Sequence, residues 1–375
     1  LSTAQIASIS TSQVDQLTTA QVKVLSSAQI AALTTAQAAK LTTLQLNTLS
    51  ATQVAAITTT NLATLTTTQL QGVNATSIKS LTTAQITSLG GLGTAQVSGL
   101  STAQIAALTT SQITALTSAQ VSILGSTQLA ALSSAQVKGF ETADLAVLSS
   151  DQVRAMSASA VSGLTSDQVT SLTTNQVANL MTSQVAALSA AQAKGIATDD
   201  LVKLDSSQVQ ALGTAALAAL NTAQVSAITT AQIDKLTTAQ VKALSNDQVA
   251  SLTTAQASKL TTAQLNTLSA GQVAVMGTAS LATLTTTQLQ ALTNAAVAAL
   301  TTAQITKLDG LGTAQVSGLS TGQIAALTTA QVAVLTTAQA SSLGTAQLAA
   351  LSSSQVKNLV TADLAVLSSD QVRAM

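Results

Sequence analysis

Apolar and polar positions alternate with a period of eight along the whole chain, most clearly in Thr237–Leu244. When each repeat is counted to end at its Leu-type residue, Val, Ile or Leu usually occupies position 5 and Leu position 8. Ser or Thr usually opens the repeat, and Gln occupies position 4 in 37 of 46 repeats. Ser/Thr-x-x-Gln is a capping box, in which the hydroxyl accepts from the N–H three residues on and the Gln reaches back to the first N–H. The pattern therefore predicts one short capped helix in each repeat.

The charged residues support this prediction. All 13 basic residues, such as Lys23 and Arg154, lie at position 6 or 7 of their repeats. The acidic residues lie mainly at positions 1, 3 or 4, and the exceptions are Asp15, Asp234 and Asp309. Acidic side chains near a helix N-terminus and basic ones near its C-terminus complement the helix dipole. A strand offers no reason for this distribution.

The period also excludes one long helix. At 100° per residue the apolar stripe would rotate by about 80° in each octad and would never keep one face. A β-solenoid is the alternative, because Thr and Val favour strands. Positions 5 and 8 have opposite parity, however, and would lie on opposite faces of a strand. We predict an all-α solenoid of very short helices, with positions 5 and 8 inside.

The period continues without a linker, so we expect a single octapeptide-repeat array over residues 1–375, cut from a longer polypeptide. It consists of 44 octads and two eleven-residue repeats, Gly90–Leu100 and Asp309–Leu319. A super-repeat of 219 residues is superimposed, in which residues 1–156 duplicate residues 220–375. Each repeat is too small to fold alone and must stack on its neighbours.

The repeats that lack Gln at position 4 suggest how the array winds. Those with Asn61, Asp144, Asp200, Ser280 and Asp363 are separated by 10, 7, 10 and 10 repeats. If they share one edge, each turn contains about 3.4 repeats, or about 27 residues. Asp144 and Asp200 are then expected about 16 to 20 Å apart along the axis, and 46 repeats make a rod of roughly 110 to 135 Å.

Composition narrows the classes of function. Charged residues make up 7% of the chain, the net charge is zero, and Pro, Cys, His, Trp and Tyr are absent. No basic field attracts nucleic acid, and no aromatic platform stacks on bases. Without His or Cys, Ser/His and Cys/His nucleophilic machinery is excluded, and no run of about 20 apolar residues is present to span a bilayer. We expect no enzyme, no catalytic or cofactor-binding residue, no cofactor, no nucleic-acid partner and no transmembrane segment.

One acidic cluster, formed by Asp199, Asp200 and Asp205, has the oxygen ligands that Ca²⁺ prefers. These residues occupy the helix-start positions where acids recur throughout the chain, and the loop spacing of a calcium site is absent. We therefore favour helix capping and predict no metal site.

Other conspicuous features have structural interpretations. Asp151 and Arg154, repeated at Asp370 and Arg373, form i,i+3 pairs worth a few tenths of a kcal/mol. The stretches at 90–93 and 310–312 lack the Lys and Ser/Thr of a phosphate loop, and we interpret them as three-residue insertions in a turn. A row of Gln amides is able to bind a sugar or another chain, but the capping box already engages position 4, and we favour internal hydrogen bonding.

Ser/Thr-x-x-Gln-Val-x-x-Leu runs such as Leu108–Ile113 resemble the octapeptide arrays of very large bacterial surface or secreted proteins, often adhesin-like. The resemblance covers the whole chain and implies an extracellular or cell-surface, non-enzymatic role. We predict a structural rod, either the stalk of a giant adhesin or a stretch of an extracellular filament. Low charge and scattered apolar positions predict self-association into fibres or bundles. The alternative is ice binding, because Thr at positions 1 and 2 is able to form a flat hydroxyl-methyl array.

Overall fold

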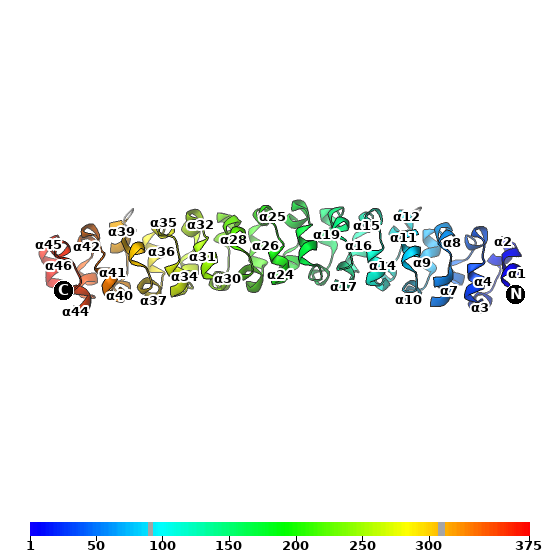
Figure 1. Cartoon of the computed structure of the whole chain (residues 1–375), viewed down its shortest axis with the longest axis horizontal. Helices are drawn as coiled ribbons and strands as arrows, with labels where there is room; N and C mark the ends of the chain where they lie inside the picture. Colours follow the sequence, from blue (N-terminus) through cyan, green and yellow to red (C-terminus); the bar gives the residue numbers. More distant parts are fainter. Residues whose placement is uncertain (89–92, 307–311) are drawn as a thin grey trace. The chain divides into compact units, whose positions relative to one another are not determined.

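The computed structural model describes residues 1–88, 93–306 and 312–375. Across these ranges all regular secondary structure is α-helical and no strand is present, which confirms the all-α prediction and leaves the β-solenoid without support. The described residues form two compact units, Leu1–Leu188 and Ser189–Met375, and each unit is described by itself. The same one-helix-per-repeat pattern occurs in both units (Figure 1).

The helices of the N-terminal unit are α1 (Thr3–Ser8), α2 (Thr11–Asp15), α3 (Thr19–Lys23), α4 (Ser27–Ala31), α5 (Thr35–Ala38), α6 (Thr43–Asn47), α7 (Ala51–Ala56), α8 (Thr59–Thr64), α9 (Thr67–Gly72), α10 (Ala75–Ile78), α11 (Thr83–Ser88), α12 (Thr94–Ser98), α13 (Thr102–Ala107), α14 (Thr110–Thr114), α15 (Ser118–Ser122), α16 (Ser126–Ala130), α17 (Ser134–Val137), α18 (Thr142–Ala146), α19 (Ser150–Ala155), α20 (Ala158–Val161), α21 (Ser166–Thr170), α22 (Thr174–Ala178) and α23 (Thr182–Ala186).

The helices of the C-terminal unit are α24 (Ala190–Lys194), α25 (Thr198–Lys203), α26 (Ser206–Ala211), α27 (Thr214–Ala218), α28 (Thr222–Ala227), α29 (Thr230–Ile233), α30 (Thr238–Ala243), α31 (Asn246–Ala250), α32 (Thr254–Lys259), α33 (Thr262–Leu265), α34 (Ala270–Ala274), α35 (Thr278–Ala282), α36 (Thr286–Gln290), α37 (Asn294–Ala298), α38 (Thr302–Thr306), α39 (Gly312–Ser317), α40 (Thr321–Ala326), α41 (Thr329–Val332), α42 (Thr337–Ser342), α43 (Thr345–Ala349), α44 (Ser353–Val356), α45 (Thr361–Ala365) and α46 (Ser369–Ala374). None of the helices described in either unit has the length and apolarity needed to cross a membrane.

Most helices begin at the predicted capping box. At the start of α30 the Gln240 N–H donates to Thr237 Oγ1 over 3.1 Å, and the Thr237 N–H donates to Gln240 Oε1 over 2.8 Å. The helix ends at Leu244, whose φ of −61° and ψ of 138° are extended. An extended residue at position 8 turns the chain out of the helix and delivers the next Ser or Thr to its own capping position. The short helices therefore follow from the sequence of each octad.

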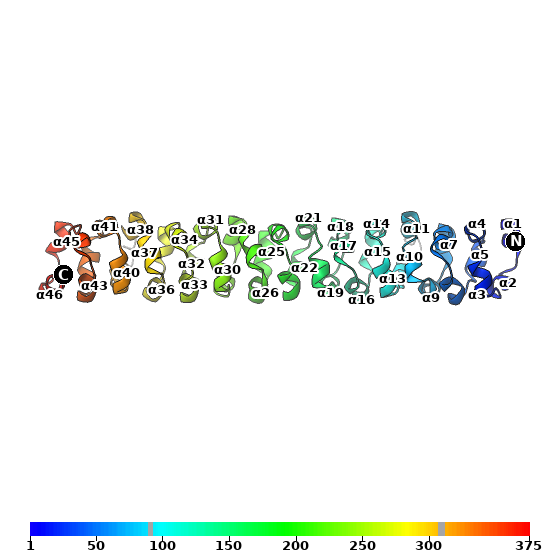
Figure 2. The same ribbon diagram turned by 90° about the horizontal axis from the view of Figure 1, so that it is seen from below.

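Each unit is a superhelix in which a helix packs against the third helix after it, as α4 does with α7 and α37 with α40 (Figures 1 and 2). Hydrogen bonds described below reach the fourth repeat back. Each turn therefore contains between three and four repeats, in agreement with the spacing of the repeats that lack Gln. Asp144 and Asp200 lie in different units, and their common edge stays a prediction.

The core of each unit is built from positions 5 and 8, as predicted. Val121 and Leu124 of one repeat are 0% and 1% exposed, and the single Phe, Phe140, is buried at position 8. At several repeats a Gly at position 7 lies close to position 2 of the repeat three earlier. A Cβ on Gly163 would lie only 2.3 Å from the Ser134 carbonyl oxygen. The turns thus stack closely along this seam.

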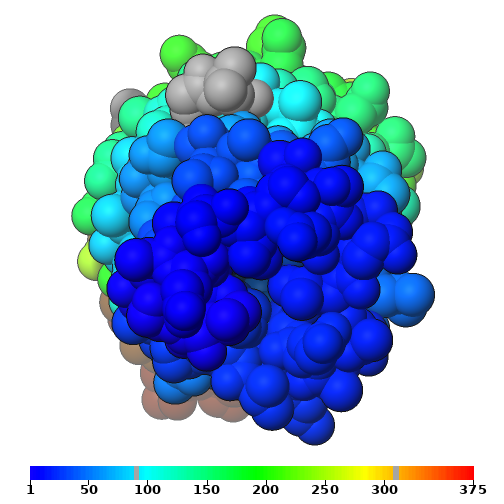
Figure 3. Space-filling model, turned by 90° about the vertical axis from the view of Figure 1, so that its right-hand side faces the viewer, coloured from blue at the N-terminus to red at the C-terminus, as the bar shows by residue number. Residues whose placement is uncertain are grey.

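The interior is open to solvent at the first repeats of the N-terminal unit, which face the viewer in Figure 3. A depression of about 250 Å³ there is lined by apolar residues that include Leu17, Val24 and Leu25. In later repeats of the same unit the equivalent Leu residues at position 8 are buried, for example Leu41 and Leu49. The stacking of successive turns is therefore what covers position 8.

Candidate functional site: the glutamine ladder between turns

The position-4 glutamines are buried, although an exposed Gln is sufficient for a capping box. Gln120 and Gln339 are fully buried, and most position-4 glutamines from Gln37 onward are nearly so. Gln5 and Gln13, in the first two repeats, are exposed. Burial of an amide is costly unless both its donor and its acceptor are paired. The position-4 Gln must therefore have partners beyond its own repeat.

Both the oxygen and the nitrogen of the side-chain amide form hydrogen bonds. In the repeat 237–244, Gln240 Oε1 accepts from the Thr237 N–H, as described above. Its Nε2 donates to the carbonyl oxygens of Val209, Gln210 and Leu212, over 3.1, 3.1 and 2.7 Å. These carbonyls lie at the end of the helix four repeats earlier, where backbone donors become scarce. The Val209 carbonyl also accepts from the Leu212 N–H over 3.2 Å. One side chain thus caps the start of its own helix and the end of another.

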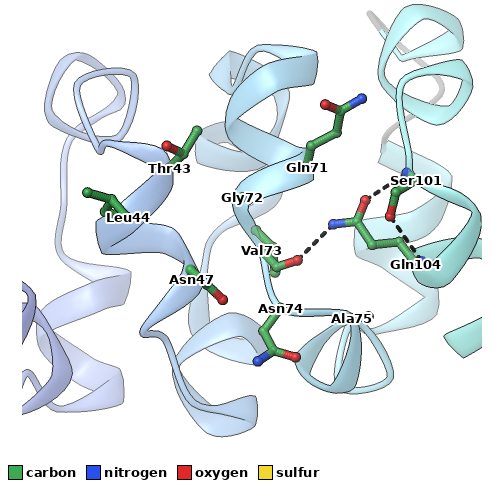
Figure 4. Close-up of a pocket in the computed structure, with 10 residues that line it drawn as sticks. All are labelled: Thr43, Leu44, Asn47, Gln71, Gly72, Val73, Asn74, Ala75, Ser101 and Gln104. Carbon is green, nitrogen blue, oxygen red and sulfur yellow. Dashed lines mark hydrogen bonds between the residues drawn. The ribbon is translucent and has the colours of Figure 1, made fainter.

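This connection recurs at almost every turn, and we call the set of position-4 glutamines the glutamine ladder. Gln53 donates to Leu25 O and Gln136 to Leu108 O, both over 2.8 Å. Figure 4 shows the same geometry at Gln104, which accepts from the Ser101 N–H and donates to the carbonyl of Val73 over 2.8 Å.

A shallow groove of about 400 Å³ lies beside this part of the ladder (Figure 4). It is lined by Thr43, Leu44, Asn47, Gln71, Gly72, Val73, Asn74, Ala75, Ser101 and Gln104. None of these side chains titrates at physiological pH or acts as an activated nucleophile. Amides and hydroxyls in this arrangement form hydrogen bonds, but they supply no acid–base chemistry.

The ladder keeps its register across the eleven-residue repeats. Gln45 donates to carbonyls 31 and 28 residues earlier, at Val14 and Leu17. Gln96, which follows the first insertion, donates to carbonyls 34 and 31 residues earlier, at Leu62 and Leu65. The sequence offset grows by three while the partner stays four repeats back. The repeats on either side of the insertion therefore remain in phase.

The insertions themselves, predicted to lie in a turn, fall largely outside the described residues, at 89–92 and 307–311. Of the Gly-rich stretches, only Gly93 and Gly312 are described. Gly93 lies at the N-cap of α12 without a side-chain cap, and Gly312 begins α39.

Shorter polar side chains replace Gln at a few positions and in part keep the bond between turns. Asn61 Nδ2 donates to the Leu33 carbonyl over 2.8 Å, and Ser77 Oγ donates to the Leu49 carbonyl over 3.1 Å. Both residues are buried. Ala160, Ala216 and Ala296 offer no donor at this position.

Aspartate at position 4 behaves differently, because an ionised carboxylate only accepts hydrogen bonds. Asp144 accepts from the Ser118 hydroxyl over 2.8 Å and from the Glu141 N–H over 3.0 Å. Asp363 occupies the equivalent position in the duplicated block and is fully buried, and neither of its oxygens has a hydrogen-bond partner within the described ranges. Burial raises the pKa of Asp363. The Val360 N–H, which approaches the carboxyl group without completing a hydrogen bond to either oxygen, lowers the pKa by less.

The acidic cluster considered for Ca²⁺ is distributed over two helices. Asp199 and Asp200 lie in the first turn of α25, where Asp199 is exposed and Asp200 buried. Asp205 caps α26 and accepts from the Gln208 N–H over 2.8 Å. Across the described ranges, no group of three or more His, Cys, Asp or Glu side chains is arranged to hold a metal ion. All three residues lie at helix starts, but only Asp205 caps its helix, because the N-cap of α25 is Ala197 and has no side-chain cap.

The two predicted i,i+3 pairs differ. Arg373 and Asp370 approach to 3.7 Å, and both side chains are more than 80% exposed. The duplicate residues Arg154 and Asp151 form no ion pair in the described part of the chain. An exposed pair at this distance contributes little to stability.

Comparison with known proteins identifies a repeat family. The ALTTAQ repeat matches residues 16–43, 89–118, 137–174, 193–230, 201–238, 226–262, 306–337 and 341–375. Together these ranges cover more than half of the chain. No curated protein matches the chain.

Proposed function

We propose that this chain, which belongs to the ALTTAQ repeat family, is a non-enzymatic structural rod that serves as the stalk of a giant surface adhesin or as a stretch of an extracellular filament. The observation that carries the proposal is the glutamine ladder. The same buried amide joins almost every turn to the turn before it, with nearly identical geometry in both units. A catalytic protein concentrates its special residues at one place, whereas here the repeated contact is the special feature.

The ladder suits a spacer because its contacts are local and equivalent. In a solenoid each repeat contacts only its neighbours, so stability is a sum of repeat and interface terms. To open one turn, a pulling force must break the amide bonds of a Gln and expose its Val and Leu. The remaining turns keep their own contacts. Such an array is expected to lengthen turn by turn and to retain its remaining structure under load.

Association between copies is part of the proposal. Exposed apolar residues within the array include Leu44 at position 3 and Val147 at position 7, which are 70% and 47% exposed. The chain has few charges and no net charge to oppose association. An extracellular or cell-surface location rests on the resemblance to large bacterial surface proteins.

Small-angle X-ray scattering of the full chain tests the rod. We expect a maximum dimension of roughly 110 to 135 Å. A radius of gyration of about 21 Å, the value for a compact globule of this length, would contradict the proposal. Light scattering over a concentration series tests association, and a strictly monomeric chain at high concentration argues against the filament. The ice-binding alternative stays a prediction, and the absence of thermal hysteresis would remove it.

A further inference from the structure

One carboxyl group of the C-terminal unit is placed where the ladder needs a hydrogen-bond donor. In the repeats on either side of Asp363, Gln355 Nε2 donates to the Leu327 carbonyl over 2.6 Å and Gln371 Nε2 to the Leu343 carbonyl over 2.7 Å. The same 28-residue offset assigns the Leu335 carbonyl to Asp363. No hydrogen bond reaches the Leu335 carbonyl within the described residues. In the two flanking repeats an amide donor is matched with a carbonyl acceptor. Here a carboxylate is matched with a carbonyl, and both groups are hydrogen-bond acceptors.

The surroundings provide no cation to pair with this carboxylate. Helix α45, which carries Asp363, packs against α42, and neither α42 nor the stretch 328–335 contains an ionisable residue. The charged groups nearest in sequence, Lys357, Asp370 and Arg373, are exposed, and the last two pair with each other. A buried carboxylate without a partner is strongly disfavoured and is relieved by taking up a proton.

Asn61 shows what the protonated group is able to do. Asn and protonated Asp have the same shape, and each carries a donor at the end of the side chain. Asn61 Nδ2 lies 2.8 Å from the Leu33 carbonyl, 28 residues earlier. A side chain one carbon shorter than Gln therefore reaches across the turn.

We propose that Asp363 is a proton-operated latch, in which the protonated carboxyl donates its O–H to the Leu335 carbonyl and joins two consecutive turns, and the ionised carboxylate releases them. The inference rests on the fold and not on the proposed function. The duplicate Asp144 has no such role, because the Ser118 hydroxyl and the Glu141 N–H both donate to its ionised form. The equivalents of these two residues beside Asp363 are Thr337 and Val360, which also carry a hydroxyl and an N–H. Within the described residues neither of them completes a hydrogen bond to Asp363, and the Val360 N–H lowers the pKa of Asp363 by less than burial raises it.

The direction of the pH effect follows from burial. Because burial raises the pKa of folded Asp363 above its ordinary value, the folded chain binds the proton more tightly than the unfolded chain does. The latch is complete below the unfolded pKa, and its contribution is lost as pH rises through the folded pKa. This turn is therefore expected to be better protected in mild acid than at neutral pH, opposite to the behaviour of a salt-bridged Asp.

The test combines the titration of Asp363 with local hydrogen exchange in the full chain. We expect the ¹³C carboxyl resonance that disappears in Asp363→Asn to titrate above the ordinary Asp value. Exchange protection of residues 328–367, compared with Asp363→Asn at the same pH, should fall by about tenfold for each unit of pKa elevation as Asp363 ionises. Asp363→Asn should keep this turn protected throughout the window. Asp144→Asn, the matched control, should leave the protection of residues 328–367 and its pH dependence unchanged.

Two results would overturn the latch. If Asp363 titrates at or below the ordinary Asp value, its carboxylate is held by local donors, as Asp144 is. If added CaCl₂ or NaCl restores protection at neutral pH in the natural chain but not in Asp363→Asn, a cation occupies the site in place of the proton.

Discussion

The two copies of the duplicated block, residues 1–156 and 220–375, differ where the glutamine ladder is interrupted. In the first copy Asn61 and Ser77 each donate to a carbonyl of the neighbouring turn. In the second copy the equivalent residues are Ser280 and Ala296, and neither makes such a bond in the described part of the chain. Asp144 and Asp363 are a third pair, of which only Asp144 accepts completed hydrogen bonds within the described ranges.

This difference shows how the fold tolerates the loss of one position-4 glutamine, which we call a rung of the glutamine ladder. The glutamines that flank the interruptions are kept in both copies, as Gln69 and Gln288 are, and they donate to Leu41 and Leu260 over 2.7 Å. Each interruption is therefore held by intact rungs on both sides. The first copy is expected to resist local opening at these repeats better than the second copy does.

The largest loss of stability is expected when a position-4 glutamine that is present in both copies is replaced. Gln45→Ala and Gln264→Ala each remove the capping-box acceptor and the amide bonds to two carbonyls. We expect a loss of about 2 to 4 kcal/mol in each copy, because the cap is lost and the carbonyls of Leu17 and Leu236 lose their amide donor, while those of Val14 and Ile233 keep a backbone N–H. Denaturant unfolding and local hydrogen exchange measure the loss. The control Gln13→Ala removes only an exposed capping box and should cost about 0.5 kcal/mol; equal losses at Gln13 and Gln45 would contradict the ladder.

A smaller effect is expected when the copies exchange residues at the first interruption. Asn61→Ser should lower local stability by about 1 to 2 kcal/mol, because the bond to the Leu33 carbonyl is lost. Ser280→Asn should raise it by a similar amount if the new amide reaches the Leu252 carbonyl, 28 residues earlier. Hydrogen exchange of the two repeats, compared at one pH, measures both changes. Unchanged exchange in both variants would show that the bond at Asn61 contributes nothing.

The second interruption should respond in the same direction but more weakly. Ser77→Ala removes one hydroxyl bond of 3.1 Å and should cost about 0.5 to 1.5 kcal/mol. Ala296→Ser, in the other copy, should restore part of that amount. A stabilising Ser77→Ala would mean that burial of the hydroxyl costs more than its bond returns.

The smallest effect is expected at the exposed ion pair between Arg373 and Asp370, which is present in the second copy and absent from the first among the described residues. Arg373→Ala should leave thermal unfolding unchanged, as should Arg154→Ala, because an exposed pair at 3.7 Å is screened by water and salt. A clear loss of stability in Arg373→Ala alone would assign a structural role to the pair.

The helices, their caps and the buried positions could be predicted from the sequence because they depend on interactions within one octad. The bonds of Gln240, for example, include one to Thr237, three residues away, and three to residues about 30 positions away. A capping-box motif describes only the first. The bonds between turns could not be found from local pattern, since they depend on where the superhelix places an earlier repeat.

The sequence nevertheless contains one indication that the position-4 Gln also bonds to the neighbouring turn. Glu is as suitable as Gln for a capping box, yet Glu never occupies position 4, and the chain contains a single Glu, Glu141. A carboxylate supplies the acceptor for the N-cap but lacks the donor for the neighbouring turn. The choice of Gln over Glu in 37 of 46 repeats indicates that a donor is needed at most of these positions.

The unchanged partners of Gln96 across the first insertion have a consequence for how such arrays can be altered. The position-4 glutamine bonds to the repeat four earlier whether or not three residues are inserted between them. The phase of the superhelix is therefore insensitive to these extra residues at that connection. A peptide or a folded domain spliced there is expected to be displayed outside the wall while the coil continues in step. The winding is then expected to shift when a position-4 glutamine repeat is deleted, and to keep its phase when residues are added at this connection.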